Sequence, residues 1–450
     1  MTTDLRSWLA LLDERGELGV LGAPIDPDQE VAAVLEHSDG RRAVRFDAVK
    51  GSRFPLVGNT LIGRSHLGPA LGCATPEAAE RFAAALDRPR SCRVVDRAEA
   101  PVLEEQLTGD ALLSALPLTR QHEHDGGLYL TSALLSVRDP VSGTTNLSIN
   151  RLQAAGEREL RALLLPGRLR AVFTAAEAEG RDLDVAIVVG VHPLLVLASQ
   201  SPADRALDDL EVASALASEP LPVVTAPSVD AVVPAEAEFL LEGRFRAGRR
   251  EAEGPFGEFP RTYGPGGPAP VIELEAAWHR RDAVFQTILS AGREHFLVGG
   301  LPREALLLRA LRKAGLDVAG LRLPESGSCR FDAVVALRDP APGAVTTAML
   351  TLFTGAVTVK TVTVVDDDVD VFDDEQIGWA VATRVQADRD LLVVPNAKGS
   401  SLDPSARGGV TAKLGIDATV PANDRGRFRQ MRVAPPDPDR LRGHLAELGL

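Results

Sequence analysis

The sequence predicts a multidomain α/β (α+β) protein with a strand-rich central part. Its 450 residues correspond to about three domains at roughly 150 residues each. Helical and strand-like patterns alternate near both ends of the chain, whereas turns and β-branched runs dominate the middle. We therefore expect an N-terminal α/β domain over residues 1–110, a central β-rich domain over 111–298 and a C-terminal α/β domain over 299–450.

The first hundred residues carry the alternation that predicts an α/β domain. Apolar residues recur at helical spacing over 5–15, and Asp4 is placed to cap that helix. Short apolar runs over 43–46 and 54–57 are typical of strands. Residues 76–86 have the spacing of a second helix, with proline in its first turn.

The central part begins with a hairpin pattern. Runs over 128–137 and 144–152 are apolar and β-branched, and they flank the turn-forming residues 139–143. Beyond them we expect a helix over 168–180, strands over 185–191 and 221–233, a loop over the Gly- and Pro-rich 251–268, and an antiparallel pair of strands over 271–276 and 283–289.

The C-terminal part alternates helices with strands. An amphipathic pattern predicts a helix over 301–314. The alternation after it is typical of βαβ units, with strands over 329–337, 357–365 and 391–394, helices over 345–353 and 374–383, and a terminal helix over 435–450.

Charge and composition exclude several classes of protein. Asp and Glu number 63 against 49 Lys and Arg, a net charge of −14, which disfavours nucleic-acid binding and a polybasic membrane anchor. The longest apolar stretch, 185–199, contains His192 and Pro193 and is shorter than the ~20 residues of a membrane helix. Three separated cysteines form no disulfide framework. We expect a soluble, cytoplasmic protein.

Familiar catalytic signatures are absent from the sequence, which contains no P-loop, Rossmann glycine pattern, HExxH motif, nucleophile elbow or zinc-spaced Cys/His cluster. The best chemical candidate is the pair Glu253 and Glu258, separated by a Gly-Pro-Phe-Gly turn that can bring both carboxylates to one point. Two close acids push their pKa values apart, so that one keeps a proton while the other is ionised. The alternative is an exposed acidic loop.

A second candidate lies on the strand after the hairpin turn. Asn146, Ser148 and Asn150 share one face of that strand. Arg151 lies on the opposite face unless the end of the strand redirects it. The forked guanidinium of an arginine suits a carboxylate or a phosphate, and the alternative is a salt bridge on the surface.

Two further segments offer weak metal-site patterns. His122 and His124 are two residues apart and no third ligand follows nearby, so turn or cap roles explain 122–127 better. The acidic run 366–370 lacks the glycine and the twelfth-position glutamate of a calcium loop. A strand end that leads into a helix N-terminus explains that run.

Taken together, these segments resemble the UbiD family of prenylated-flavin-dependent decarboxylases. The resemblance keeps the family's order over nearly the whole chain, and the joint order and spacing of its pieces are specific. It runs through the opening Asp4-Leu5-Arg6 helix, His122 with 125–127, 145–151, 233–238 with 241–243, 253–258, 366–369, Thr383-Arg384, and Lys413 with 417–419.

The resemblance implies a fold and a catalytic centre. The fold is an N-terminal α/β domain, a central split β-barrel that binds the flavin, and a C-terminal α/β domain with a linking and a terminal helix. The implied catalytic residues are Arg151, Glu253 and Glu258. Glu258 would be the general acid that protonates the carbon losing CO2, and the other two would form the ion-pair network that sets its protonation and orients the flavin.

The implied cofactor is prenylated FMN, with its phosphate held through Mn2+ and with K+ as a further ion. Asn146 and Glu238 match two metal ligands of the family, but Arg168 stands where a histidine is expected. Because arginine does not ligate a cation, our hypothesis is that Arg168 replaces part of the metal's charge at the phosphate. The implied cofactor-binding residues are Asn146, Ser148, Ile149, Arg151, Arg168, Ser199, Glu238 and Lys413.

Residues 291–303 resemble the subgroup that acts on furan and pyrrole carboxylates, which implies His295 and Arg303 as substrate-binding residues. The alternatives are a loop histidine and a solvent-facing arginine. The leading prediction is a carboxy-lyase that reversibly decarboxylates a heteroaromatic or α,β-unsaturated acid. An aryl or polyketide-derived acid, net carboxylation, or a flavin-binding protein without turnover are alternatives. We expect a flavin prenyltransferase as cofactor supplier and a homodimer or higher homo-oligomer.

Overall fold

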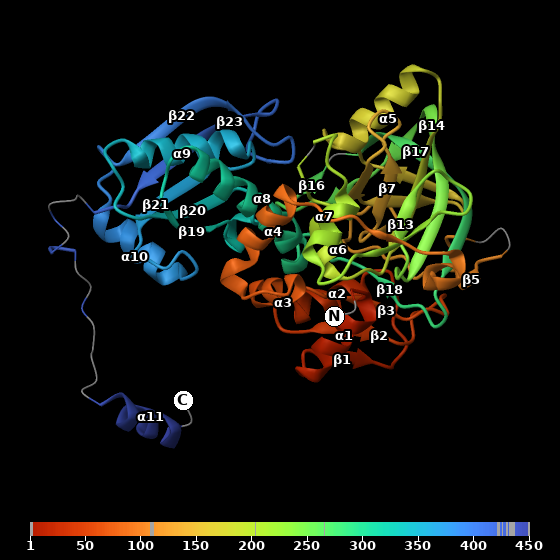
Figure 1. Ribbon diagram of the computed structural model, residues 1–450, viewed down its shortest axis with the longest axis horizontal. Helices are drawn as coiled ribbons and strands as arrows, with labels where there is room; N and C mark the ends of the chain where they lie inside the picture. The colour runs from red at the N-terminus through yellow and green to blue at the C-terminus, as the bar shows by residue number, and fades with distance from the viewer. Residues whose placement is uncertain are drawn as a thin grey trace.

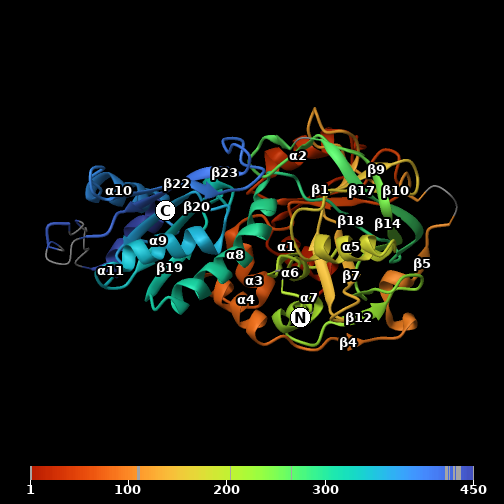
Figure 2. The same ribbon diagram turned by 90° about the horizontal axis from the view of Figure 1, so that it is seen from above.

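Three main sheets organise the residues that the computed structural model describes, which are 3–108, 112–202, 204–264, 266–420, 424, 426–428, 431 and 437–448. A four-stranded sheet forms near the N-terminus, a nine-stranded sheet occupies the middle of the chain, and a five-stranded sheet follows the long helix α8. Figures 1 and 2 show the five-stranded sheet as a lobe beside the rest, with α8 between them.

The N-terminal sheet has the strand order β1-β2-β3-β18. Helix α1 begins where the Asp4 carboxylate accepts the backbone N–H of Ser7 at 2.8 Å, which satisfies one of the free donors of the first turn. The predicted cap and helix are therefore confirmed. The elements of this part are α1 (Leu5–Glu14), β1 (Leu18–Leu21), α2 (Glu30–Ser38), β2 (Ala43–Phe46), β3 (Leu56–Gly58), α3 (Leu67–Leu71) and α4 (Ala78–Asp87).

The central sheet has the order β6-β9-β10-β17-β14-β11-β7-β8, with β5 beside β17, and it curls into a half-barrel (Figure 1). All its pairings are antiparallel. Its strands are β5 (Glu105–Gln106), β6 (Tyr129–Leu130), β7 (Leu134–Arg138), β8 (Thr145–Ile149), β9 (Leu152–Ala155), β10 (Glu159–Ala162), β11 (Leu183–Val189), β14 (Phe239–Glu253) and β17 (Gly267–His279).

Strand β11 lies between two hydrophobic cores. Val185 and Ile187 pack into one core, and the alternating residues Ala186 and Val188 pack into the other. A strand that is buried on both faces needs apolar residues at every position. This burial explains the apolar run from Val185 to Val189. Among the described residues no helix is both long and apolar enough to span a membrane.

Helices and short strands connect and cover the central sheet. The predicted helix at 168 is confirmed as α5 (Arg168–Ala178), and the predicted hairpin is confirmed by the pairing of β7 with β8. The remaining elements are α6 (Pro193–Ala198), α7 (Asp209–Leu216), β4 (Arg93–Val94), β12 (Pro222–Thr225), β13 (Val232–Pro234), β15 (Phe256–Gly257), β16 (Tyr263–Gly264) and β18 (Phe285–Gln286).

The C-terminal sheet has the order β19-β20-β21-β23-β22 and confirms the predicted βαβ unit, because β20 pairs parallel with β21 across helix α9. Leucines of α8 and α9 share a core with Val335, whereas Ala380 of α10 shares a core with Val334 on the opposite face. The elements are α8 (Arg293–Lys313), β19 (Val318–Arg322), β20 (Asp332–Leu337), α9 (Ala344–Gly355), β21 (Thr361–Asp366), α10 (Asp374–Arg384), β22 (Leu391–Lys398), β23 (Val410–Asp417) and α11 (Pro438–Glu447).

Two sequence predictions about the central part are wrong. Residues 251–268 are not all loop, because the β14–β17 ladder continues until Glu253 faces Gly267. Residues 283–289 do not pair with 271–276, since β18 lies parallel to β3 in the N-terminal sheet. A short apolar run carries no signal of its partner strand. Of the predicted terminal helix, 435–436 and 449–450 lie outside the described residues.

Helix α8 joins the C-terminal lobe to the N-terminal part and begins earlier than predicted, at Arg293. Its buried Glu304 accepts two hydrogen bonds from the Arg64 guanidinium, at 2.6 and 3.0 Å, and one from the backbone N–H of Leu323 at 2.8 Å. One carboxylate therefore contacts both parts of the molecule. This contact restricts the position of the C-terminal lobe relative to the N-terminal part.

Phe239 tests the packing between the N-terminal and central sheets. Its ring is fully buried and meets the rings of Phe54 and Phe285 edge-on, with centroids 5.0 and 5.3 Å away. We expect Phe239→Ala to reduce the free energy of unfolding by about 3–5 kcal/mol, because it removes apolar burial and leaves a cavity. Denaturant unfolding followed by circular dichroism measures this loss. The control is Phe372→Ala, at a residue 43% exposed; an equal loss in both variants would contradict the packing described.

Candidate active site

A cavity of about 460 Å³ opens between the central sheet and the C-terminal lobe. Its walls come from β8 and the turn after it, the start of α5, the segment after α6, the loop between β14 and β17, helix α8 and loops of the C-terminal lobe. It brings together most of the residues implied by the resemblance, namely Asn146, Ser148, Ile149, Arg151, Arg168, Ser199, Glu258, His295 and Arg303.

Arg151 joins the two acids that the sequence singled out. Its Nε and Nη2 donate to the two carboxylate oxygens of Glu253 at 3.0 and 2.9 Å, and its Nη1 donates to Glu258. The Tyr129 hydroxyl donates a further hydrogen bond to Glu253 at 3.2 Å. Glu253 is 2% exposed and Glu258 9%. Neither an exposed acidic loop nor a surface salt bridge describes these residues.

Arg151 reaches the cavity because strand β8 ends before it. The strand stops at Ile149, and β9 starts at Leu152. The two-residue alternation of a strand would have placed Arg151 opposite Asn146. The break between the two strands redirects the guanidinium, and both residues line the same cavity.

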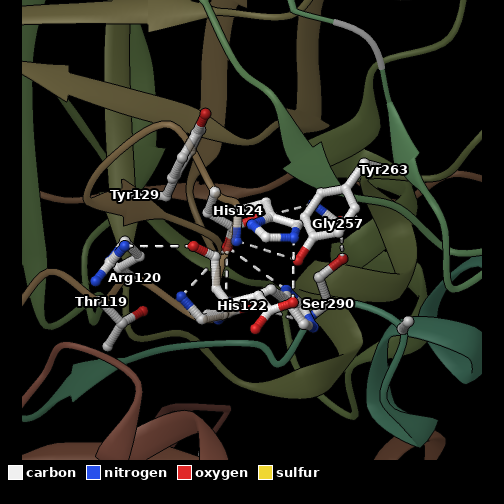
Figure 3. A network of polar contacts seen from close by, with 12 residues as sticks. Thr119, Arg120, His122, His124, Tyr129, Gly257, Tyr263 and Ser290 are labelled. Atoms are coloured by element: carbon white, nitrogen blue, oxygen red, sulfur yellow. Dashed lines mark hydrogen bonds and ion pairs between the residues drawn. The ribbon is translucent and has the colours of Figure 1, made fainter.

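The loop that carries Glu258 is fixed by a network of polar contacts (Figure 3). The buried Asp125 carboxylate accepts the backbone N–H groups of His122 and Gly257, each at 2.9 Å. The hydroxyl of Ser290 donates to the carbonyl of Gly257. The segment 122–127 thus forms a turn that positions the loop, as the sequence analysis preferred over a metal site.

Backbone contacts hold the same loop at its other end. The N–H of Gly126 donates to the carbonyl of Pro255 at 2.8 Å. Gln153 accepts the N–H of Gly254 at 3.0 Å and donates to the carbonyl of Gly126 at 2.7 Å. A Cβ atom at Gly126 would overlap the carbonyl oxygen of Gly254, so this close approach requires glycine.

Burial raises the pKa of Glu258 above its usual value. The positive charge of Arg151 opposes this shift, while the negative charge of Glu253 adds to it. A carboxyl that is shielded from water, and whose charge is only partly compensated by nearby positive charge, keeps its proton to a higher pH than an exposed carboxyl. The two acids therefore differ in environment, because Glu253 accepts the bidentate ion pair of Arg151, whereas burial and the charge of Glu253 raise the pKa of Glu258.

A second buried ion pair lies in the cavity wall. Arg168 forms an ion pair with Asp209, whose Oδ2 also accepts the Nδ2 of Asn146 at 3.1 Å and the N–H of Leu147 at 2.7 Å. Burial raises the pKa of Asp209 to about 6, against the opposing charge of Arg168. The sequence analysis missed Asp209. The available signal was the pair Asp208-Asp209 before an apolar run, because an aspartate cap and acidic residues in the first turn are both favoured at a helix N-terminus.

A divalent metal ion does not fit these side chains. The guanidinium of Arg168 occupies the place beside Asn146 and Asp209 where a third metal ligand would have to lie. Guanidinium carries no lone pair for a metal and repels a cation. Among the described residues, no group of three or more His, Cys, Asp or Glu side chains is placed to hold a metal ion.

The structure places Glu238 and Lys413 away from this cluster, and neither lines the cavity. Glu238 accepts two hydrogen bonds from the Arg6 guanidinium, at 2.8 and 3.0 Å, and one from the N–H of Val284. The implied metal ligand Glu238 is therefore corrected to a structural ion-pair partner. The ammonium of Lys413 donates to three backbone carbonyls at the end of α9 and before β21. Its implied contact with the flavin phosphate stays a prediction.

Two buried arginines and a histidine face the cavity from α8 and the loop before β20. Arg303 and Arg330 both line it, and among the described residues neither forms an ion pair. Arg303 donates a hydrogen bond to the carbonyl of Gly299, and Arg330 donates one to the carbonyl of Ser328 at 3.1 Å. Burial, with the charge of Arg303, lowers the pKa of Arg330 to about 9. The sequence analysis did not identify Arg330.

His295 lines the cavity as a neutral imidazole. Burial lowers its pKa to about 3, and the charges of Arg330 and Arg303 add to that shift. Its Nδ1 accepts the backbone N–H of Ala291 at 3.1 Å. The proton of the neutral ring therefore lies on Nε2, which is left as a hydrogen-bond donor.

Comparisons with known proteins identify the family of this chain. Models of the 3-octaprenyl-4-hydroxybenzoate carboxy-lyase match residues 9–86 with its N-terminal domain, 93–293 with its Rift-related domain and 296–418 with its C-terminal domain. The chain is 36% identical over 423 residues to anhydromevalonate phosphate decarboxylase of Methanothermobacter thermautotrophicus. The aligned region covers 93% of this chain and 98% of the relative.

Solved structures give the same result. The UbiD-class enzyme HmfF from Pelotomaculum thermopropionicum, in complex with FMN, has a TM-score of 0.94 at 43% identity, over 97% of this chain and 98% of that one. An evolved dimeric form of HmfF in complex with prFMN has a TM-score of 0.90 at 40% identity, over 98% of each chain. Fold and site thus define a decarboxylase of the carboxy-lyase class. The chain belongs to the UbiD family.

The role assigned to Glu238 can be tested by a double-mutant cycle with Arg6. We expect Glu238→Ala to reduce the free energy of unfolding by about 1–3 kcal/mol, since it leaves the buried N–H of Val284 and the half-exposed guanidinium of Arg6 without their acceptor. Arg6→Ala should cost less because Arg6 is half-exposed, and the double variant should lose less than the sum of the two. Denaturant titration measures all three. Strictly additive losses would contradict the pairing.

Proposed function

We propose that this UbiD-family protein uses prenylated FMN to decarboxylate, reversibly and without net oxidation, a heteroaromatic or α,β-unsaturated carboxylic acid that carries a second anionic group. The observation that carries this proposal is the buried Arg151, which pairs two carboxylates of different character in the cavity wall. The bound FMN and prFMN of the similar HmfF structures support the choice of cofactor.

The residues of the cluster divide the work of a proton transfer. Prenylated FMN, when bound, would supply the electron-accepting ring that stabilises the negative charge left on carbon as CO2 departs. Glu258 then donates its proton to that carbon, and in the reverse direction its carboxylate removes the proton. Glu253 balances most of the charge of Arg151 through two hydrogen bonds, so that Glu258 remains free to exchange its proton.

The cavity offers the flavin unsatisfied polar groups. Asn146 Oδ1 and Arg168 Nε are buried and have no hydrogen-bond partner among the described residues. With Ser148, Ile149 and Ser199, which line the same space, they form the wall that would hold the cofactor. A flavin prenyltransferase would supply it, and the dimeric HmfF form supports a homodimer. The K+ ion implied by the resemblance stays a prediction.

The second anionic group of the substrate is inferred from Arg303 and Arg330. Two buried guanidinium groups without a carboxylate partner repel each other, and their burial is costly unless a bound anion compensates it. A Cβ atom at Gly299 would overlap Arg330, and both arginines approach this glycine. An anion between the two forks would accept charge-assisted hydrogen bonds, with the Nε2–H of His295 as a neutral donor nearby.

A second candidate substrate is an unsaturated acid that carries a phosphate ester. The same two guanidinium groups suit a phosphate as well as a carboxylate. The similar anhydromevalonate phosphate decarboxylase is named for a phosphorylated substrate. Two alternatives are an aryl or polyketide-derived acid as substrate and a flavin-binding protein without turnover. Measurements of CO2 release distinguish both from the proposed reaction.

Glu258 is tested by loading the enzyme through co-expression with a flavin prenyltransferase and measuring CO2 release over heteroaromatic, cinnamic and aliphatic acids. We expect Glu258→Gln to lower kcat roughly 100-fold or more while the flavin absorbance is retained. Because Glu258 must be protonated to act, wild-type activity should fall as pH rises through its raised pKa. Glu253→Gln removes a negative charge that raises this pKa, so its activity should fall at lower pH. Full activity of Glu258→Gln would refute the assignment.

The proposed binding of a second anionic group by Arg303 and Arg330 is tested with pairs of acids that differ only in one carboxylate. We expect Arg303→Gln and Arg330→Gln each to raise KM for a furan or pyrrole dicarboxylic acid tenfold or more, since each removes a charged hydrogen-bond donor. KM for the corresponding monocarboxylic acid should change little. A phosphorylated unsaturated acid, assayed in parallel, decides between the two candidate substrates. Equal effects on the mono- and dicarboxylic acids would contradict a second anion site.

A further inference from the structure

Arg168 and Asp209 meet in the cavity wall at the starts of two helices. They are the first residues of α5 and α7, and their side chains are only 3% and 2% exposed. Nη1 of Arg168 also donates to the carbonyls of Asp204, at 2.7 Å, and Leu207. The guanidinium is thus fixed in one orientation by an ion pair on one side and backbone carbonyls on the other.

The same wall leaves donors for an anion. Nε of Arg168 is buried without a hydrogen-bond partner among the described residues. The N-cap of helix α5 is Gly167, which makes no side-chain cap, and the first backbone N–H groups of the helix have no intrahelical partner. Gly167, Leu169 and Arg170 line the cavity together with Arg168. Free N–H groups at a helix N-terminus beside an arginine are a favourable site for a phosphate.

We propose that Arg168, held in place by Asp209, binds the phosphate of the flavin cofactor directly, so that the cofactor binds without a divalent metal ion. This inference rests on the proposed function, because it takes a flavin mononucleotide as the ligand. It concerns only how the phosphate is held.

The carboxylate of Asp209 compensates the charge of the buried Arg168. A lone guanidinium in this position would be a buried, uncompensated charge, and the ion pair removes that cost. The three donors that converge on Asp209 Oδ2 leave this oxygen directed at protein groups rather than at a metal ion. The phosphate, with a charge of about −2, would be attracted by the guanidinium of Arg168, whose positive charge it would share with Asp209, by the exposed Arg170 and by the positive end of α5.

The test compares FMN with riboflavin, which lacks the phosphate, by fluorescence titration of the apoprotein in EDTA and in MnCl2. We expect the Kd of FMN to be the same in both buffers. The ratio of the riboflavin Kd to the FMN Kd reports the contribution of the phosphate. Because both flavins bind the same protein sample, the ratio does not depend on the folded fraction.

Three variants locate the phosphate contribution. Arg168→Gln should lower the ratio at least tenfold, whereas Arg168→Lys, which keeps the charge, should retain most of it. The double variant Arg168→Gln with Asp209→Asn removes both charges of the ion pair and replaces the single variant if that one does not fold. Its ratio of the riboflavin Kd to the FMN Kd should fall as much as that of Arg168→Gln. The control Arg181→Gln removes an exposed charge just after α5 and should not change the ratio.

The outcomes separate this inference from the proposed function. A wild type that binds FMN only in MnCl2, or an unchanged ratio in Arg168→Gln, would overturn the inference and leave the flavin assignment intact. An equal fall in Arg168→Lys and Arg168→Gln would also overturn it, because the positive charge would then not matter. A wild type that binds neither flavin in either buffer would overturn both.

Discussion

The antiparallel pairing of β14 with β17 is the constraint on which the active site depends. The ladder extends from Phe239 opposite His279 to Glu253 opposite Gly267. At its start, Phe239 packs against rings of the N-terminal part. At its end, the strand delivers Glu253 to Arg151 and opens into the loop that carries Glu258. One continuous pairing therefore links the packing of two sheets to the position of the two acids.

The cavity gathers arginines in a chain that carries a net charge of −14, and their partners separate their roles. Arg151 and Arg168 are each balanced by buried carboxylates, which fix their orientation. Arg303 and Arg330 are buried without such a partner among the described residues. Because an unpaired buried charge is costly, the burial of Arg303 and Arg330 is the observation from which we propose a second anionic group on the substrate.

The part of the candidate site that lies close in sequence could be predicted from it. Glu253 and Glu258 are five residues apart on one turn, and Arg151 belongs to a compact motif; the structure brings all three together. The resemblance to the family implied Glu238 as the acid beside Asn146, whereas the structure places Asp209 there, and a match of local motifs does not show which distant segment folds back. Arg330 was not predicted because no local pattern shows that the loop before β20 folds against the cavity.

The sequence by itself determined the local elements and the alternation of helices and strands, because apolar periodicity and capping residues such as Asp4 act over a few neighbours. It also determined the residue types of the reacting cluster. Only the tertiary structure decided which strands pair, that β18 joins β3, and that Asp209 rather than Glu238 lies beside Arg168. These outcomes depend on contacts between segments far apart in the chain, whose free energies come from burial and ion pairing that no local pattern encodes.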